Sequence, residues 1–281
     1  MALVTPAPRD QFSTVLRTST VATLLALLSA PVAPATEIMV TDEDIQAGET
    51  VYWTAENTYI LQGRVFVDPG ATLVIEAGTV IKGAAGTGES ASVLVVARGG
   101  KIYAEGTADR PIIFTAEADD VTNPLDIAYD AVELWGGLIV LGNAPINIAA
   151  GETNIEGIPA ESRGMYGGND TEDNSGVIRY VSIRHGGIEI GEGNDINGLT
   201  LGGVGSGTTI EYVEVFSNKD DGVEIFGGTV NAKHLVVAFC RDDSFDFDEG
   251  LQSKLQFLFA IQAPTTGDHC GEHDGAPDSD V

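Results

Sequence analysis

Short apolar runs follow one another along the chain from about residue 50 onward. Gly, Asp, Asn and Pro separate these runs, and several of them alternate apolar with polar positions. Val, Ile, Thr and aromatic residues dominate the runs, which is typical of β-strands. After residue 35 no stretch keeps the apolar period of an amphipathic helix. The pattern therefore predicts an all-β protein, with strands in the segments 64–67, 71–78, 92–97, 111–117 and 137–143.

Later segments of the chain also resemble one another. Aligned on their apolar positions, they place Tyr180, Tyr212 and His234 in the same column, at offsets of 32 and 22 residues. A repeat of about 20–50 residues indicates a solenoid or array, and unequal offsets indicate insertions at one corner. We therefore expect His234 to be a stacked structural residue, like the two tyrosines. The repeated segments are 177–187, 209–222 and 231–244.

These features predict a parallel β-helix, in which each coil adds two or three strands to long parallel sheets. A propeller would need a more even period of about 40 residues. A sandwich would show two-residue hairpin turns of the Asn-Gly type, which are scarce here. We expect one domain with a cap at 36–57, the β-helix at 58–265 and an acidic loop or tail at 266–281. The last coil of this β-helix would present an open sheet edge. Such an edge is what a chain truncated at its C-terminus would have.

The acidic composition restricts the partners. The 281 residues include 42 Asp and Glu but 14 Lys and Arg, giving a formal net charge of −28. Such a surface repels nucleic acid and anionic lipid, so a nucleic-acid partner is excluded. It attracts divalent cations and keeps an exported protein soluble.

The first 35 residues have the pattern of a secretory signal peptide. Arg9 and Arg17 precede the apolar run 21–28, and Ala-Pro-Ala at 33–35 is a small-x-small cleavage site. The run is shorter than the roughly 20 residues that span a bilayer, and no later segment is a candidate membrane helix. We therefore expect an exported protein, located at the cell surface, in the periplasm or outside the cell.

Two Asp pairs recur at the repeat spacing, as Lys-Asp-Asp at 219–221 and Arg-Asp-Asp at 241–243, an offset of 22 residues. Adjacent coils lie about 4.8 Å apart, so these carboxylates would repel one another unless they were neutralised. Ca²⁺, which takes about six to eight oxygen ligands in tolerant geometry, would do so. Alternatively, Lys219 and Arg241 would neutralise a solvated corner. The candidate calcium ligands are Asp220, Asp221, Glu224, Asp242, Asp243 and Asp246.

The Gly-rich loop at 166–176 is a second candidate calcium site, through Asp170, Glu172 and Asp173. Its sequence does not have the Gly and Glu positions of an EF-hand loop. A long solvated loop is the alternative interpretation.

The segment 268–275 collects metal-binding residue types. His269 and His273 are four positions apart, which on a helix would direct both imidazoles to one metal, but the flanking Gly, Pro and Asp argue against a helix. The spacing alone is a weak transition-metal signal. Cys270 lies in the same segment. Export would permit a disulfide between Cys270 and Cys240, and two free thiols fit the sequence equally well.

Several segments resemble secreted bacterial proteins with a right-handed parallel β-helix of the pectate-lyase-like type. They are GATLVIEAGTVIKG, GGKIYAEGTADRPIIFTAE, WGGLIVLGNAPI and DDGVEIFGGTVNAKHLVVAF. The resemblance extends over about residues 59–273. It implies the fold, whereas activity must be argued from a site, because one fold hosts many functions.

Two functions fit these observations. The first is an exported binding or structural module, stabilised by Ca²⁺, that contacts polysaccharide or another surface component. The second, implied by the resemblance, is a polysaccharide lyase or glycoside hydrolase, which uses acidic clusters with Ca²⁺ and a basic proton acceptor, or paired carboxylates. In this second function, the residues that would carry catalysis are His185, Asp220, Asp221, Arg241, Asp242 and Asp243.

We expect Trp135 to pack in the core or a corner.

Overall fold

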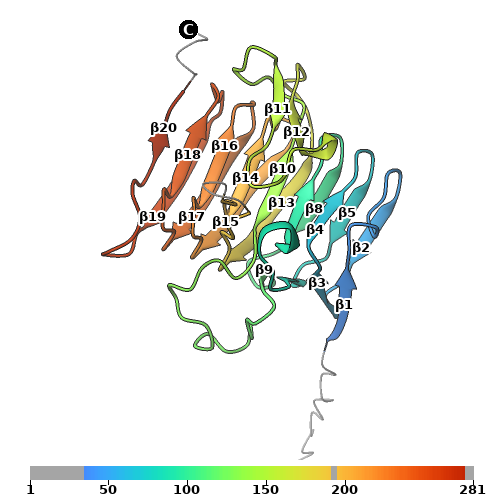
Figure 1. Ribbon diagram of the computed structural model, residues 1–281, viewed down its shortest axis with the longest axis vertical. Helices are drawn as coiled ribbons and strands as arrows, with labels where there is room; N and C mark the ends of the chain where they lie inside the picture. Colours follow the sequence, from blue (N-terminus) through green and yellow to red (C-terminus); the bar gives the residue numbers. More distant parts are fainter. Residues whose placement is uncertain (1–34, 191–194, 276–281) are drawn as a thin grey trace, which may run out of the picture. The chain divides into compact units, whose positions relative to one another are not determined.

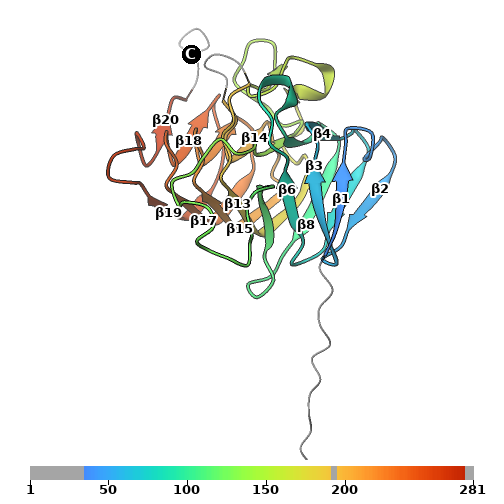
Figure 2. The same ribbon diagram turned by 60° about the horizontal axis from the view of Figure 1, so that its bottom comes forward.

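Strands stack on the equivalent strands of neighbouring coils, and successive strands along the chain turn through three faces (Figures 1 and 2). The computed structural model describes residues 35–190 and 195–275. The predicted signal peptide, apart from Ala35, lies outside these residues, as does the end of the predicted tail at 276–281. No helix in the described part of the chain is long and apolar enough to cross a bilayer.

The first two faces form one sheet of eleven strands, and the third face is a sheet of seven strands. The strands of the larger sheet are β1 (Thr36–Val40), β2 (Thr50–Trp53), β3 (Asn57–Leu61), β5 (Thr72–Ile75), β6 (Val80–Gly83), β8 (Lys101–Glu105), β9 (Ile112–Ala116), β13 (Gly176–Arg184), β15 (Thr209–Phe216), β17 (Asn231–Ala238) and β19 (Leu255–Ile261). Those of the third face are β4 (Arg64–Val67), β7 (Val93–Val96), β10 (Leu138–Leu141), β14 (Leu199–Gly202), β16 (Val223–Phe226), β18 (Phe245–Asp248) and β20 (Glu272–His273). All strand pairings in both sheets are parallel.

Other regular structure is sparse. An antiparallel pair, β11 (Glu152–Asn154) with β12 (Met165–Gly167), lies in the insertion between β10 and β13. The helices in the described residues are two single 3-10 turns, η1 (Gly88–Ser90) and η2 (Ser162–Gly164). The predicted all-β parallel helix is therefore confirmed.

One residue in the left-handed conformation turns each long strand from the first face to the second. Tyr180, Tyr212, His234 and Phe257 occupy this corner, with φ of 48, 56, 58 and 60°. The left-handed region costs a non-glycine residue roughly 1–2 kcal/mol. Stacking of the four rings, whose successive centroids are 4.5, 4.4 and 4.6 Å apart, offsets part of that cost. The predicted alignment of Tyr180, Tyr212 and His234 is thus confirmed.

Inward-facing side chains of equivalent strands stack to form the core. The pairing places Val181, Val213, Leu235 and Leu258 in one column, and the first three are almost fully buried. A second apolar cluster lies outside the third face, where the insertion at 142–175 covers β4, β7 and β10. The outer surface of this face is thus apolar in the early coils.

Segments at both ends of the domain contribute strands to the parallel sheets. Residues 36–57, expected as a cap, contribute β1 and β2, which pair with β3 and β5, and no third-face strand lies between them in this described segment. The expected acidic tail contributes β20, which pairs with β18. The last long strand, β19, lies at the edge of the larger sheet, with Phe257 and Phe259 65% and 56% exposed.

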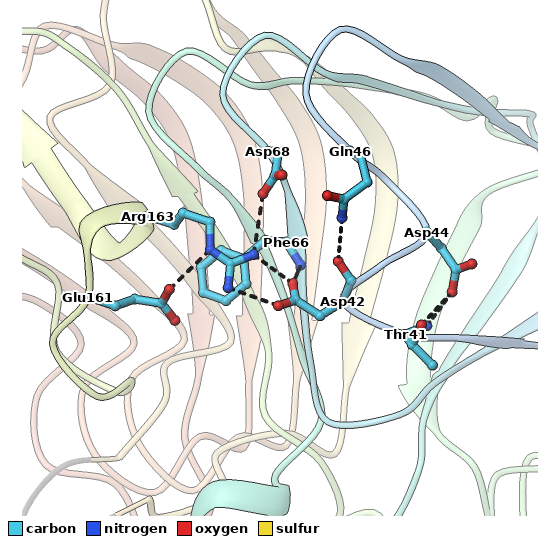
Figure 3. A network of polar contacts seen from close by, with 8 residues as sticks. All are labelled: Thr41, Asp42, Asp44, Gln46, Phe66, Asp68, Glu161 and Arg163. Carbon is cyan, nitrogen blue, oxygen red and sulfur yellow. Dashed lines mark hydrogen bonds and ion pairs between the residues drawn. The ribbon is translucent and has the colours of Figure 1, made fainter.

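Arg163 ties the insertion to the first coils (Figure 3). Its two terminal nitrogens donate to the two carboxylate oxygens of Asp42 at 2.8 Å, and one of them also lies 3.3 Å from Asp68. Its Nε donates to Glu161 at 3.0 Å, and the guanidinium lies 3.8 Å from the centre of the Phe66 ring. Bidentate pairing and ring contact are the strong modes of arginine interaction.

We expect Arg163→Gln to lower the free energy of unfolding by about 1–3 kcal/mol, because it breaks charge-assisted hydrogen bonds to three carboxylates. Urea unfolding followed by circular dichroism measures the effect. The matched control is Arg110→Gln, which removes an exposed pair with Glu76 at 3.6 Å and should cost less than about 0.5 kcal/mol. Equal effects of the two substitutions would contradict a clamping role for Arg163.

Candidate functional site

Acidic side chains line up across the last coils of the third face. The strand pairing joins Thr200, Glu224, Asp246 and Glu272 in register. In earlier coils the same column contains Val95 and Ile139, which the insertion buries. The outward column therefore changes from apolar residues to carboxylates where the acidic coils begin.

A second column lies in the turns that precede these strands. The backbone N–H of Asp221 donates to Asn197 Oδ1 at 3.2 Å, and that of Asp243 donates to Asp221 Oδ1 at 2.9 Å. The N–H of His269 continues the series by donating to Asp243 Oδ1 at 2.6 Å. The side chains of Asn197, Asp221 and Asp243 thus each accept a hydrogen bond from the next coil. These bonds fix the positions of the two Asp carboxylates.

We call the two columns together with the neighbouring Asp220 and Asp242 the acidic ladder. Oxygens of Asp220, Asp221 and Asp242 lie within 4.8 Å of one another, as do those of Asp221, Glu224 and Asp246. Only 7% of Asp221 and 6% of Glu224 is exposed. The six calcium ligands predicted from the sequence are thus clustered, since a third group joins Asp242 and Asp243 to Asp268.

Burial makes ionisation of Asp220, Asp221 and Glu224 unfavourable. Burial, with repulsion from Asp195 and Glu156, raises the pKa of Asp220 to about 7. Burial, with repulsion from Asp220, raises the pKa of Asp221 to about 9. The pKa of Glu224 is raised far above its usual range, chiefly by burial and by the nearby Glu156. Without a cation, Asp221 and Glu224 therefore retain protons near neutral pH.

The neighbouring bases do not pair directly with the ladder in the described part of the chain. Lys219 Nζ instead lies 3.1–3.3 Å from Glu133, Glu189 and Asp195. Arg241 donates to the backbone oxygen of Asp130 at 3.2 Å. Neither base therefore forms a direct ion pair with the Asp pairs among the described residues, although the charge of Lys219 partly offsets the rise in the pKa of Asp220.

Two acidic residues in or beside the ladder were not among the predicted ligands. Glu156 comes from the insertion and hydrogen-bonds to Asn197 at 3.4 Å, and Asn197 also donates to Glu224. Glu272 pairs with Asp246 at an offset of 26 residues rather than 22. One extra residue before β19 and a longer turn before β20 cause the difference, so a fixed spacing could not identify Glu272.

The other candidate residues lie apart from the ladder contacts. His185 Nδ1 bonds to the backbone oxygen of Ala131 at 2.7 Å, and its ring packs edge-on against Phe216. In the 166–176 loop, Asp170 accepts a bond from the N–H of Glu172, and Asp173 accepts one from Ser175. Among the described residues, neither His185 nor this loop belongs to a cluster of metal-binding side chains.

The two C-terminal histidines do not share a site. His269 Nδ1 lies 3.3 Å from Asp243, whereas the ring of His273 packs at a tilt against that of Phe247, with centroids 4.9 Å apart. Residues 272–273 form a strand, not the helix that would bring both imidazoles together. Cys240 is buried, Cys270 is exposed, and both are free thiols.

The ladder combines buried oxygen ligands from neighbouring coils with backbone bonds that fix their positions. Such a set suits a hard divalent cation. Comparison with known proteins identifies the domain: a family model described as a pectate-lyase like beta helix domain matches residues 44–280. No curated protein and no solved structure matches the chain.

Proposed function

Since the chain belongs to the family of pectate-lyase-like β-helix domains, we propose that it is an exported binding or structural module that Ca²⁺ stabilises at the acidic ladder. Its long β faces would contact polysaccharide or other components of the cell surface. The high net negative charge of −28 supports a secreted, cation-rich setting and opposes a nucleic-acid partner.

One observation carries the proposal: Asp221, Glu224 and Asp246 bring carboxylate oxygens within 4.8 Å of one another with no ion pair to them among the described residues. Three buried like charges at this distance are strongly unfavourable. Ca²⁺ accepts flexible coordination by carboxylate, amide and water oxygens. Asp221, Glu224 and Asp246 would hold the ion, and it would supply the missing positive charge.

The enzymatic alternative, a polysaccharide lyase or glycoside hydrolase, has less support. It needs a base or acid that faces the substrate beside the carboxylates. Arg241 is directed to Asp130, and the contacts of His185 are with Ala131 and Phe216. We therefore expect polysaccharide to be bound without cleavage, and release of unsaturated or reducing products would favour the enzyme.

Thermal melting in Ca²⁺ and in chelator tests the calcium proposal. At a Ca²⁺ concentration about 100 times the dissociation constant, we expect a stabilisation of about 2.7 kcal/mol. Glu224→Gln should abolish most of this Ca²⁺-dependent shift because it removes one buried charged ligand. Asp170→Asn, in the other predicted calcium loop, is the matched control and should keep the shift.

Two outcomes would reject this assignment. If the wild-type protein melts at the same temperature in Ca²⁺ and in chelator, the ladder does not bind Ca²⁺ at these concentrations. If Asp170→Asn removes the shift and Glu224→Gln does not, the 166–176 loop is the binding site.

A further inference from the structure

A separate pocket lies on the second face, under the long loop that joins β9 to β10 (the green loop beside β9 in Figure 1). The strand side is formed by Arg184, His185, Glu214 and Phe216, from β13, β15 and the corner after β13. The loop side includes Asp119, Asp126 and Tyr129. We call this space, of about 230 Å³, the His185 pocket.

The loop is anchored at the corner where the chain leaves the second face. Ser217 Oγ donates to the backbone oxygen of Tyr129, and the N–H groups of Glu133 and Leu134 donate to Gly186 and His185 at 2.8 and 3.1 Å. These bonds connect the loop to two successive coils. The pocket is therefore held open by fixed backbone rather than by side chains alone.

Hydrogen bonds orient the carboxylates of the pocket. Ser182 Oγ donates to Glu214 Oε2 at 2.5 Å, and Arg184 Nε donates to Ser182 Oγ at 2.7 Å. Thr115 Oγ1 donates to Asp119 Oδ2 at 2.6 Å. In each carboxylate one oxygen is thus engaged, while Glu214 Oε1 and Asp119 Oδ1 have no hydrogen-bond partner among the described residues.

The imidazole of His185 is oriented in the same way. Since the Ala131 carbonyl oxygen can only accept, Nδ1 carries the proton of that 2.7 Å bond. In the neutral ring, Nε2 is then an acceptor, and no described residue bonds to it. His185 is 6% exposed and belongs to the lining of the pocket.

The chemistry of the lining selects the ligand class. Three carboxylates, from Asp119, Asp126 and Glu214, outnumber the single guanidinium of Arg184, so an anionic ligand is disfavoured. The rings of Tyr129 and Phe216 provide apolar surface beside these acceptors. Acceptors directed at hydroxyl or amino groups, next to aromatic rings and in a space of single-ring size, suit a polyhydroxylated ring.

We propose that the His185 pocket binds one sugar unit of a glycan, either a neutral hexose or an amino sugar. Glu214, Asp119 and His185 Nε2 accept hydrogen bonds from its hydroxyl or amino groups, and Tyr129 and Phe216 contact its apolar side. The ligand class rests on the proposed function, because that function includes contact with polysaccharide. The site itself uses no residue of the acidic ladder.

Titration of the full-length protein with glucose, glucosamine and glucuronate, followed by saturation-transfer NMR, tests the inference. We expect glucose or glucosamine to bind at least about 10-fold more tightly than glucuronate, and the preference between the first two identifies a neutral or an amino sugar. Glu214→Gln and Tyr129→Ala should each weaken binding about 10-fold, which corresponds to roughly 1.4 kcal/mol. Tyr52→Ala, at another exposed tyrosine, on β2, is the control and should leave binding unchanged.

Absence of binding by all three sugars, equal binding of glucuronate, or equal loss in Tyr129→Ala and Tyr52→Ala would each overturn the pocket assignment. Melting of the same variants in Ca²⁺ and chelator separates this failure from that of the proposed function. If the protein keeps the Ca²⁺ shift but binds no sugar, only the pocket assignment is rejected. If the protein binds sugar in the expected pattern but shows no Ca²⁺ shift, the proposal of a calcium-stabilised module is rejected.

Discussion

In chelator, the free energy of unfolding should fall by on the order of 4 kcal/mol as the pH is raised from about 5 to about 8. Burial and mutual repulsion raise the folded-state pKa of Asp220 to about 7 and that of Asp221 to about 9. The pKa of Glu224 is also raised, chiefly by burial. In the unfolded chain all three carboxyls titrate near their ordinary values of about 4.

The direction of the effect follows from proton binding. Between about pH 4 and the raised pKa values, the folded protein binds more protons than the unfolded chain, so each increase in pH favours unfolding. Below about pH 4 both states are protonated, and this contribution to stability is fully present and constant. For a domain of this size the loss corresponds to a fall in melting temperature of roughly 10 °C.

Calcium should remove this pH dependence, because bound Ca²⁺ keeps the carboxylates ionised in the folded state. Melting curves at several pH values, each in Ca²⁺ and in chelator, measure the effect. Asp221→Asn is an informative variant, since its amide oxygen can still accept the bond from the Asp243 N–H. In chelator at about pH 8 it should be more stable than the wild-type protein, and in Ca²⁺ less stable. A rise in stability with pH in chelator would contradict the burial of ionisable carboxyls in the ladder.

Replacing Trp135 with Ala should lower the free energy of unfolding by about 3–5 kcal/mol. Its side chain is fully buried, and its ring stacks on Phe114 with centroids 6.5 Å apart. The indole Nε1 donates to the backbone oxygen of Arg184 at 2.6 Å. Gly83 makes the room: a Cβ at that position would lie 2.5 Å from the Trp135 Cβ.

Urea unfolding of Trp135→Ala and Trp135→Phe separates the two contributions. Trp135→Phe keeps an aromatic ring but leaves the Arg184 oxygen without its donor, so it should cost about 1–3 kcal/mol. Tyr52→Ala, at a side chain 67% exposed, should change stability by less than about 0.5 kcal/mol. A cost below about 1 kcal/mol for Trp135→Ala would contradict its role as the buried anchor of the loop between β9 and β10.

The fold could be predicted from the sequence because its signals are local and repeated. The alignment of Tyr180, Tyr212 and His234 gave the register of the long strands, and the structure shows these rings stacked at one corner. The residue type at each corner is restricted because its ring packs between the rings at the equivalent corners of the two adjacent coils. A pattern of this kind is visible without knowledge of any distant contact.

The candidate site could be predicted only where the spacing stays constant. Glu224 and Asp246 pair at an offset of 22 residues, as the sequence indicates, whereas Glu272 follows after 26. Glu156 reaches the ladder from an insertion whose path no periodicity describes. Arg241 precedes an Asp pair in the sequence, but its guanidinium turns to the loop residue Asp130. Contacts made by long loops depend on tertiary packing, which short-range patterns do not specify.

The constant spacing also bears on how such proteins change length during evolution. Residues 209–230 form one complete coil, from the start of β15 to the residue before β17. Because each coil contacts mainly the coils on either side, a tandem duplication of this DNA segment would add a coil with matching register at both junctions. It would also copy Asp220, Asp221 and Glu224, so cation-binding capacity would grow in step with the length of the protein.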